Sequence, residues 1–153
     1  MMSTDAGPPL VVKCRFAVPP ERVFDAFLDA AIARRFLFAT AAGEMIVAEI
    51  DARIGGEFTF VDRRPEMGDV RHVGEYLEID RPTRLAFTFA VPQFDPRMTR
   101  VTIEIAADGE GCALTLTHAG VPDEWGERSQ DGWRRMLTGL EPALKGVQAA
   151  GWG

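Results

Sequence analysis

Residues 99–118 read TRVTIEIAADGEGCALTLTH, and this stretch determines the fold that we expect. Apolar and polar side chains alternate over residues 101–105 and again over residues 112–116, which is typical of strands that each bury one face. The segment between them, DGEG at 108–111, has the composition of a tight turn. Because so short a connection joins antiparallel neighbours, the stretch predicts a β-hairpin with one apolar face that another element must cover.

Similar patterns fill most of the chain before this hairpin. Pro20 favours a helix start, and apolar residues at helical spacing predict a helix over residues 21–29. A second short helix is expected around Ile32, Phe36 and Leu37. Further strands, separated by turns rich in Gly, Pro and Asp, are expected at residues 10–18, 45–51, 57–62, 70–79 and 84–90.

The C-terminal segment supplies the cover for the sheet. Residues 123–150 carry large apolar side chains at i, i+3 and i+4 spacing, which predicts a long amphipathic helix. Pro142 lacks a backbone N–H and should kink this helix or end its first half. We therefore expect an α+β fold in which a curved antiparallel sheet of about seven strands wraps around one helix. Residues 1–9 are expected to form a flexible tail, and residues 10–150 a single domain.

The composition limits the functions that the chain can have. It has 153 residues, 46% of them hydrophobic, and a net charge of -6, which suits one domain and argues against sequence-independent nucleic-acid binding. No apolar run is long enough for a membrane span, and the N-terminal residues lack the pattern of a signal peptide, so a cytoplasmic location is expected. Cys14 and Cys112 are too few for a disulfide framework and are expected in the core.

Few side chains combine the types and spacing that metal binding or catalysis needs. The sequence has no clustered His/Cys/Asp set and no HExxH, Walker or GxSxG motif, so no metal or cofactor is expected. His118 continues an apolar strand face and should point inward, where it acts as acid or base or is satisfied by a backbone carbonyl or Tyr76. His72 is expected at the surface.

Carboxylates in the strands are expected to face solvent, because burying an unpaired charge is costly. This group comprises Glu57, Asp62, Glu75 and Glu104. The orientation of Glu78 is left open, because Gly74 can mark a bulge that switches the alternation beyond it.

Several local motifs, taken together, resemble one protein family. They are PERVF at 20–24, DARIGGEF at 51–58, GEYLEIDRP at 74–82, LAFTF at 85–89, LTLTH at 114–118, and Gly132-Trp133 with Leu137, Leu140 and Leu144. Over residues 11–144 the chain is similar to the homologues of the activator of the heat-shock-protein-90 ATPase. That family is a branch of the START-like (SRPBCC) superfamily, so the resemblance implies the helix-grip fold of pollen allergens and polyketide cyclases. Phe36 or Phe38, and also Phe89, stand where family members often carry tryptophan.

The resemblance further implies a cavity between the sheet and the C-terminal helix, where superfamily members hold lipids, hormones or polyketides. The same inward-facing residues would equally form an ordinary packed core. The residues expected to line the cavity are Phe58, Phe60, Tyr76, Phe87, Phe89, Val101, Ile103, Leu116 and His118 of the sheet, with Trp133, Leu137 and Leu140 of the helix.

Three functions are compatible with these observations. The first, favoured by the lack of a catalytic constellation, is non-catalytic binding of a small hydrophobic or amphipathic ligand in that cavity. The second, implied by the family name, is a co-chaperone or stress-related interaction module, in which arginine pairs at 34–35 or 63–64 meet an acidic partner. The third is a cyclase- or hydrolase-like enzyme for a hydrophobic substrate, with His118, Tyr76 and Glu78 as acid and base. The resemblance also implies a homodimer.

Overall fold

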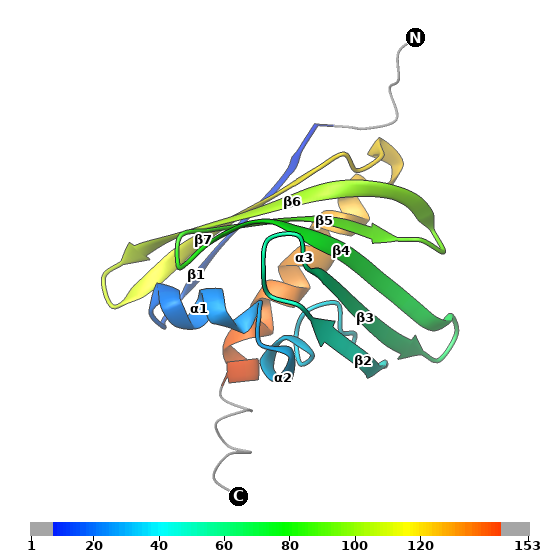
Figure 1. Cartoon of the computed structure of the whole chain (residues 1–153), viewed down its shortest axis with the longest axis horizontal. Helices are drawn as coiled ribbons and strands as arrows, with labels where there is room; N and C mark the ends of the chain where they lie inside the picture. The colour runs from blue at the N-terminus through cyan, green and yellow to red at the C-terminus, as the bar shows by residue number, and fades with distance from the viewer. Residues whose placement is uncertain (1–7, 145–153) are drawn as a thin grey trace, which may run out of the picture.

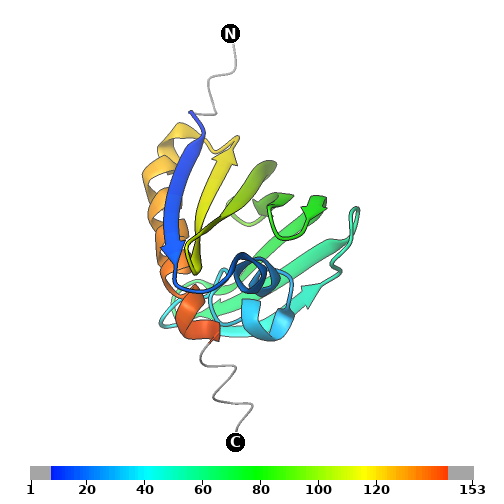
Figure 2. The same ribbon diagram turned by 90° about the vertical axis from the view of Figure 1, so that its left-hand side faces the viewer.

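The computed structural model describes residues 8–144, and its centre is one strongly bent sheet of seven strands (Figures 1 and 2). The strand order is β1-β7-β6-β5-β4-β3-β2, and every neighbouring pair is antiparallel. The strands are β1 (Leu10–Phe16), β2 (Glu44–Ile50), β3 (Glu57–Arg64), β4 (Gly68–Asp80), β5 (Arg84–Val91), β6 (Asp95–Asp108) and β7 (Gly111–Ala119). The hairpin predicted from residues 99–118 is β6–β7, with Ile103 opposite Leu116.

The helices lie close to where the sequence predicts them, although α2 ends at Ala33, before Phe36 and Leu37. They are α1 (Pro20–Ala26), α2 (Ala30–Ala33), a 3-10 turn η1 (Asp123–Trp125) and the long helix α3 (Gly126–Thr138). Pro20 occupies the first turn of α1, and the Asp29 side chain accepts a hydrogen bond of 3.0 Å from the Ala31 N–H at the start of α2. Figures 1 and 2 show α3 along the sheet, with α1 and α2 near its C-terminal end. The predicted helix-grip fold is therefore confirmed.

The sequence predicts a kink or a break of the long helix at Pro142. The structure has a break close to this position, at Gly139. α3 ends at Thr138, Gly139 forms a turn, and helical backbone resumes over residues 140–144. Pro142 has no N–H to donate to the carbonyl of Thr138, and its ring crowds that carbonyl, so one uninterrupted helix is disfavoured here. The predicted helix residues 145–150 and the tail residues 1–7 lie outside the described part of the chain.

Strand β4 differs from expectation in the position of its bulge. The register shift lies between Tyr76 and Glu78, not at Gly74. A Cβ atom at Gly74 would collide with the Thr88 carbonyl and the Phe58 ring, so glycine is needed there for close approach. Beyond the bulge, Glu78 is half-exposed and forms an ion pair of 3.0 Å with Arg84.

Candidate ligand-binding site

The interior between the sheet and α3 is filled by aromatic and aliphatic side chains. The residues predicted to line a cavity there are all buried except Phe89, which is half-buried and packs on the same core. The space left among Phe58, Tyr76 and Phe87 is about 10 Å³, room for no more than one water molecule. The packing shows these residues as core, and their role as ligand contacts stays a prediction.

Phe38 occupies the centre of this interior. Its ring stacks on His72 and on Phe89, with centroid separations of 4.7 Å and 4.9 Å, and meets the edge of Trp133 at 5.8 Å. Its backbone has φ +61°, a left-handed conformation that costs a bulky residue about 1–2 kcal/mol. The N–H of Phe38 donates to Sδ of Met136 on α3 over 3.0 Å. The connection between α2 and β2 thus places an aromatic ring inside the space between the sheet and α3.

His118 lies at the edge of this aromatic core with both ring nitrogens engaged. Its Nδ1 accepts a hydrogen bond of 3.0 Å from the indole N–H of Trp133, and its Nε2 lies 2.7 Å from Oγ1 of Thr99. The Thr99 hydroxyl in turn donates to the carbonyl of Phe89 over 2.7 Å. This assigns the proton to Nε2, because Nδ1 must accept. The partners are therefore Trp133 and Thr99, which corrects the expectation of a backbone carbonyl or Tyr76.

His118 is uncharged as well as hydrogen-bonded. Burial lowers the pKa of His118 to about 4, so the imidazole is neutral near pH 7. Burial, with a smaller contribution from Asp51, raises the pKa of Tyr76 well above its usual value. Glu78 lies in surface ion pairs with Arg84 and Arg100. Each of the three predicted acid–base residues contacts a different set of side chains, so the fold does not assemble them into one centre.

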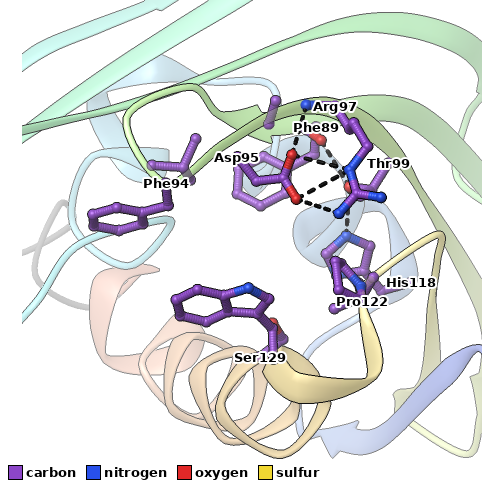
Figure 3. Close-up of a pocket in the computed structure, with 12 residues that line it drawn as sticks. Phe89, Phe94, Asp95, Arg97, Thr99, His118, Pro122 and Ser129 are labelled. Atoms are coloured by element: carbon purple, nitrogen blue, oxygen red, sulfur yellow. Dashed lines mark hydrogen bonds and ion pairs between the residues drawn. The ribbon is translucent and has the colours of Figure 1, made fainter. Parts of the chain in front are cut away.

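An open pocket lies next to the His118 network, between the β5–β6 hairpin, the end of β7 and the start of α3. It encloses about 120 Å³. Its walls are mainly apolar, with Phe89, Val91, Val121 and Pro122 around a base that includes Thr99 and His118. Figure 3 shows Ser129 on the first turns of α3 and Phe94 on the opposite side of the opening from the Asp95–Arg97 ion pair.

Two aromatic rings flank the mouth of this pocket. The rings of Phe94 and Trp125 are nearly parallel, with an angle of 11° and a centroid separation of 6.4 Å. The guanidinium of Arg128 lies over the Trp125 ring at 5.2 Å, which holds that indole in place through a cation–π contact. Phe94 is 47% exposed although it is a large apolar residue. The mouth therefore presents aromatic surface to solvent.

Only part of this pocket could be named from the sequence. Of the predicted lining residues, the structure brings Phe89 and His118 to it, whereas Phe58, Tyr76 and Leu137 lie in the closed interior. Phe94 and Trp125, which flank the mouth, were not predicted. A signal existed for Phe94, because a phenylalanine inside the turn PQFDP has no core face to occupy.

Two polar residues predicted at the surface are buried. His72 is 5% exposed, with Nδ1 3.3 Å from the Phe60 carbonyl, and burial lowers its pKa to about 4. Asp62 is fully buried, where its Oδ2 accepts from the Thr40 hydroxyl at 2.8 Å and from Nε of Arg64 at 2.9 Å. Both expectations were wrong, because each residue has the same strand phase as buried neighbours, a pattern that alternation itself predicts.

The remaining strand carboxylates behave as predicted. Glu57, Glu75 and Glu104 are exposed. Within residues 8–144, no group of three or more His, Cys, Asp or Glu side chains is placed to hold a metal ion. No helix in that range is both long and apolar enough to cross a membrane.

A bent antiparallel sheet closed by one long helix, with a small pocket at the helix start, defines a START-like helix-grip protein. The family model described as Activator of Hsp90 ATPase homolog 1-like protein matches residues 17–145. This chain therefore belongs to that family, which confirms the resemblance inferred from its motifs.

Solved structures agree with this assignment. A protein from Chromobacterium violaceum is 28% identical with a TM-score of 0.78, and the match covers 86% of this chain and 93% of that one. An HSP90 activator from Plasmodium falciparum is 25% identical with a TM-score of 0.68, covering 91% and 97%. An AHSA1-like protein from Aeromonas hydrophila, at 20% identity, 95% and 96% coverage and a TM-score of 0.77, shows the shared fold. No curated protein matches the sequence.

Proposed function

We propose that this protein binds a small, mainly apolar ligand with one aromatic ring, without catalysis, in the pocket beside His118. The observation that carries the proposal is the parallel Phe94–Trp125 pair at the mouth of an apolar pocket. Exposed aromatic surface of this kind costs free energy in water unless a partner covers it. The pocket replaces the closed interior as the binding site, while the ligand class is the one predicted from the sequence.

The dimensions of the pocket suit a single ring. Its volume of about 120 Å³ is close to that of protein cavities that take up one benzene molecule. A ring inserted between Phe94 and Trp125 would need a separation of roughly 7 Å, two van der Waals layers. The observed 6.4 Å falls slightly short of this. A small outward shift of Phe94, which lies in an exposed turn, would increase the separation of the two rings to the required value.

Polar groups at the pocket can orient such a ligand. The hydroxyl of Ser129 makes no hydrogen bond to any described residue and lines the pocket. Thr99 donates to the Phe89 carbonyl and faces Nε2 of His118, so its hydroxyl is held in one orientation. A ligand with one hydroxyl or amine on its ring would therefore find its polar partner at Ser129, and its apolar body would contact the walls.

The test uses indole and 4-methylphenol as probes in calorimetric titrations. We expect both to bind, and Phe94→Ala to weaken binding about tenfold because one face of the aromatic mouth is lost. Met98→Ala is the matched control: Met98 is 57% exposed, lies on the neighbouring strand β6 and does not line the pocket. Native mass spectrometry of freshly purified protein looks for a co-purified ligand. Absence of probe binding together with a mass equal to that of the chain alone would overturn the proposal.

A second candidate is a chaperone-interaction module, supported by the 25% identity with the Plasmodium falciparum HSP90 activator. The sequence offered arginine pairs for an acidic partner, but Arg63 pairs with Asp69 at 2.9 Å and Arg64 with the buried Asp62. Arg34 donates to the Met45 carbonyl at 2.6 Å, which leaves Arg35 as the unpaired member of these pairs among the described residues. The ATPase rate of an Hsp90-type chaperone, measured with and without this protein, tests this candidate. An unchanged rate at saturating concentration would exclude it.

A further inference from the structure

A second cleft lies at the opposite end of α3, and we propose that it binds a medium-chain carboxylate. The cleft opens between the α2–β2 connection and the C-terminal end of α3 and encloses about 580 Å³. Arg35 and Arg135 line it from these two elements, with Phe36, Met136 and Gly139 beneath them. This combination of two cations over an apolar base suits a ligand with a carboxylate head and a hydrocarbon body.

Neither Arg35 nor Arg135 has a charged partner among residues 8–144. Neither forms an ion pair or hydrogen bond with any described residue, whereas Arg34 binds the Met45 carbonyl and Arg134 lies 3.6 Å from Asp131. No carboxylate lines the cleft, although the chain as a whole has a net charge of -6. The cleft is therefore a local positive site on an acidic protein, and guanidinium groups match carboxylates through paired N–H donors.

The helix dipole offers an alternative explanation for one of these arginines. A cation in the last turn of a helix is favoured by the partial negative charge there, and Arg135 lies in the last turn of α3. This accounts for Arg135 alone, since Arg35 follows α2 and belongs to a different element. Two full positive charges also exceed the half charge at a helix end. The helix dipole therefore accounts for only one of the two arginines that line the cleft.

The base of the cleft is held from both sides. Phe36 is buried, and a Cβ atom at Gly139 would lie 3.5 Å from the Phe36 Cβ, so the end of α3 packs closely on the turn after α2. The Phe38 N–H bond to Met136 Sδ links the same two elements. The backbone segments that carry the two arginines are thus packed against each other.

This site is separate from the proposed aromatic pocket. The pocket adjoins η1 and Ser129 near the start of α3, and the cleft adjoins Gly139 after its end. Ten residues of helix separate Ser129 from Gly139, which corresponds to about 15 Å along the axis. Variants in one site therefore leave the other intact.

The experiment compares sodium octanoate with 1-octanol by calorimetry at low ionic strength. We expect octanoate to bind about tenfold more tightly than octanol, because only the carboxylate pairs with the guanidinium groups. Arg35→Gln and Arg135→Gln should each weaken octanoate binding about fivefold to tenfold and leave octanol binding unchanged. Added salt should weaken octanoate binding further, since the pairs are solvent-exposed.

Two controls isolate the cleft. Arg134→Gln removes the same charge from the adjacent helix position outside the cleft, and it should change octanoate binding less than twofold. Phe94→Ala tests whether octanoate enters the aromatic pocket instead. Equal affinities for octanoate and octanol, or unchanged octanoate binding in both glutamine variants, would overturn the proposal. Loss of octanoate binding in Phe94→Ala alone would assign it to the other pocket and likewise overturn it.

Discussion

The indole N–H of Trp133 donates to Nδ1 of His118 over 3.0 Å, and both side chains are buried. Trp133 belongs to α3 and His118 to β7, so this bond joins the helix to the sheet. Continuing through Thr99 to the Phe89 carbonyl, it forms a chain of three hydrogen bonds at the edge of the core. Such a chain favours one arrangement of helix and sheet, because each member left unpaired incurs a desolvation cost.

Replacing Trp133 by Phe removes the donor and keeps an aromatic ring. Nδ1 of His118 is then buried without a partner, so we expect the free energy of unfolding to fall by about 2–3 kcal/mol. Urea-induced unfolding at pH 7 measures the change. Trp125→Phe is the control, because that indole lies half-buried at the pocket mouth, and we expect a change within about 0.5 kcal/mol. Equal losses in the two variants would contradict the role given to the buried bond.

Acid should destabilise this protein through its two histidines. Burial lowers the pKa of both His72 and His118 to about 4, whereas an unfolded histidine titrates near pH 6.5. Between these values the unfolded chain binds more protons than the folded one. Stability is therefore fully present above about pH 6.5 and is lost as the pH falls toward 4. We expect the free energy of unfolding to fall by about 2 kcal/mol per pH unit near pH 5.

Unfolding in urea at pH 7, 6 and 5 measures this slope. His118→Gln removes one of the two titrating groups and retains a polar side chain. The slope near pH 5 should then fall to about half of its original value. A slope that is the same in the variant and in the original protein would show that other groups cause the acid sensitivity.

Removing the Phe38 ring should open the closed interior. Phe38→Ala leaves a cavity among rings that now contact Phe38, with an expected loss of about 3–4 kcal/mol in the free energy of unfolding. Alanine is usually more stabilising than glycine, but the left-handed φ of +61° at residue 38 should reverse that order of stability. Phe38→Gly should be more stable than Phe38→Ala by about 1 kcal/mol, because glycine adopts this conformation freely.

Thermal unfolding with added benzene reports whether the new cavity is accessible. Benzene should raise the melting temperature of Phe38→Ala more than that of the original protein, in which only the pocket beside His118 can take up a ring. Phe94→Ala keeps the interior closed and weakens the pocket beside His118, so benzene should raise its melting temperature no more than that of the original protein. An alanine variant more stable than the glycine variant would argue against strain at residue 38.

Two glycine variants should have opposite effects. A Cβ atom at Gly43 would collide with the Thr40 hydroxyl and with both carboxylate oxygens of Asp62, which is buried and hydrogen-bonded. We expect Gly43→Ala to cost about 1–3 kcal/mol. Gly132 lies within α3 with no atom in the way of a Cβ, so Gly132→Ala should gain up to about 1 kcal/mol. Chemical unfolding of both variants provides the measurement, and a gain in Gly43→Ala would contradict the packing described here.

The sequence by itself determined the order of the elements and the sheet with its covering helix. Alternation in residues 101–105 and 112–116 and helical spacing around Trp133 are local patterns, and they report which face of each element is buried. The same alternation indicates that Asp62 and His72 are buried. Each lies on the same face of its strand as an apolar neighbour, Phe60 for Asp62 and Tyr76 for His72. The two residues were predicted to be exposed because they are polar, although their position in the alternation indicates burial.

Only the tertiary structure shows which side chains fill the space between the sheet and α3, and where a pocket remains open to solvent. Phe38 comes from an irregular connection, and no periodicity shows that its ring enters the space between the sheet and α3. The partners of His118 are 15 and 19 residues away along the chain, and Arg35 and Arg135 come from opposite ends of it. Such contacts depend on how curved elements pack, because side-chain volume and the path of a loop are fixed only when the whole core is assembled.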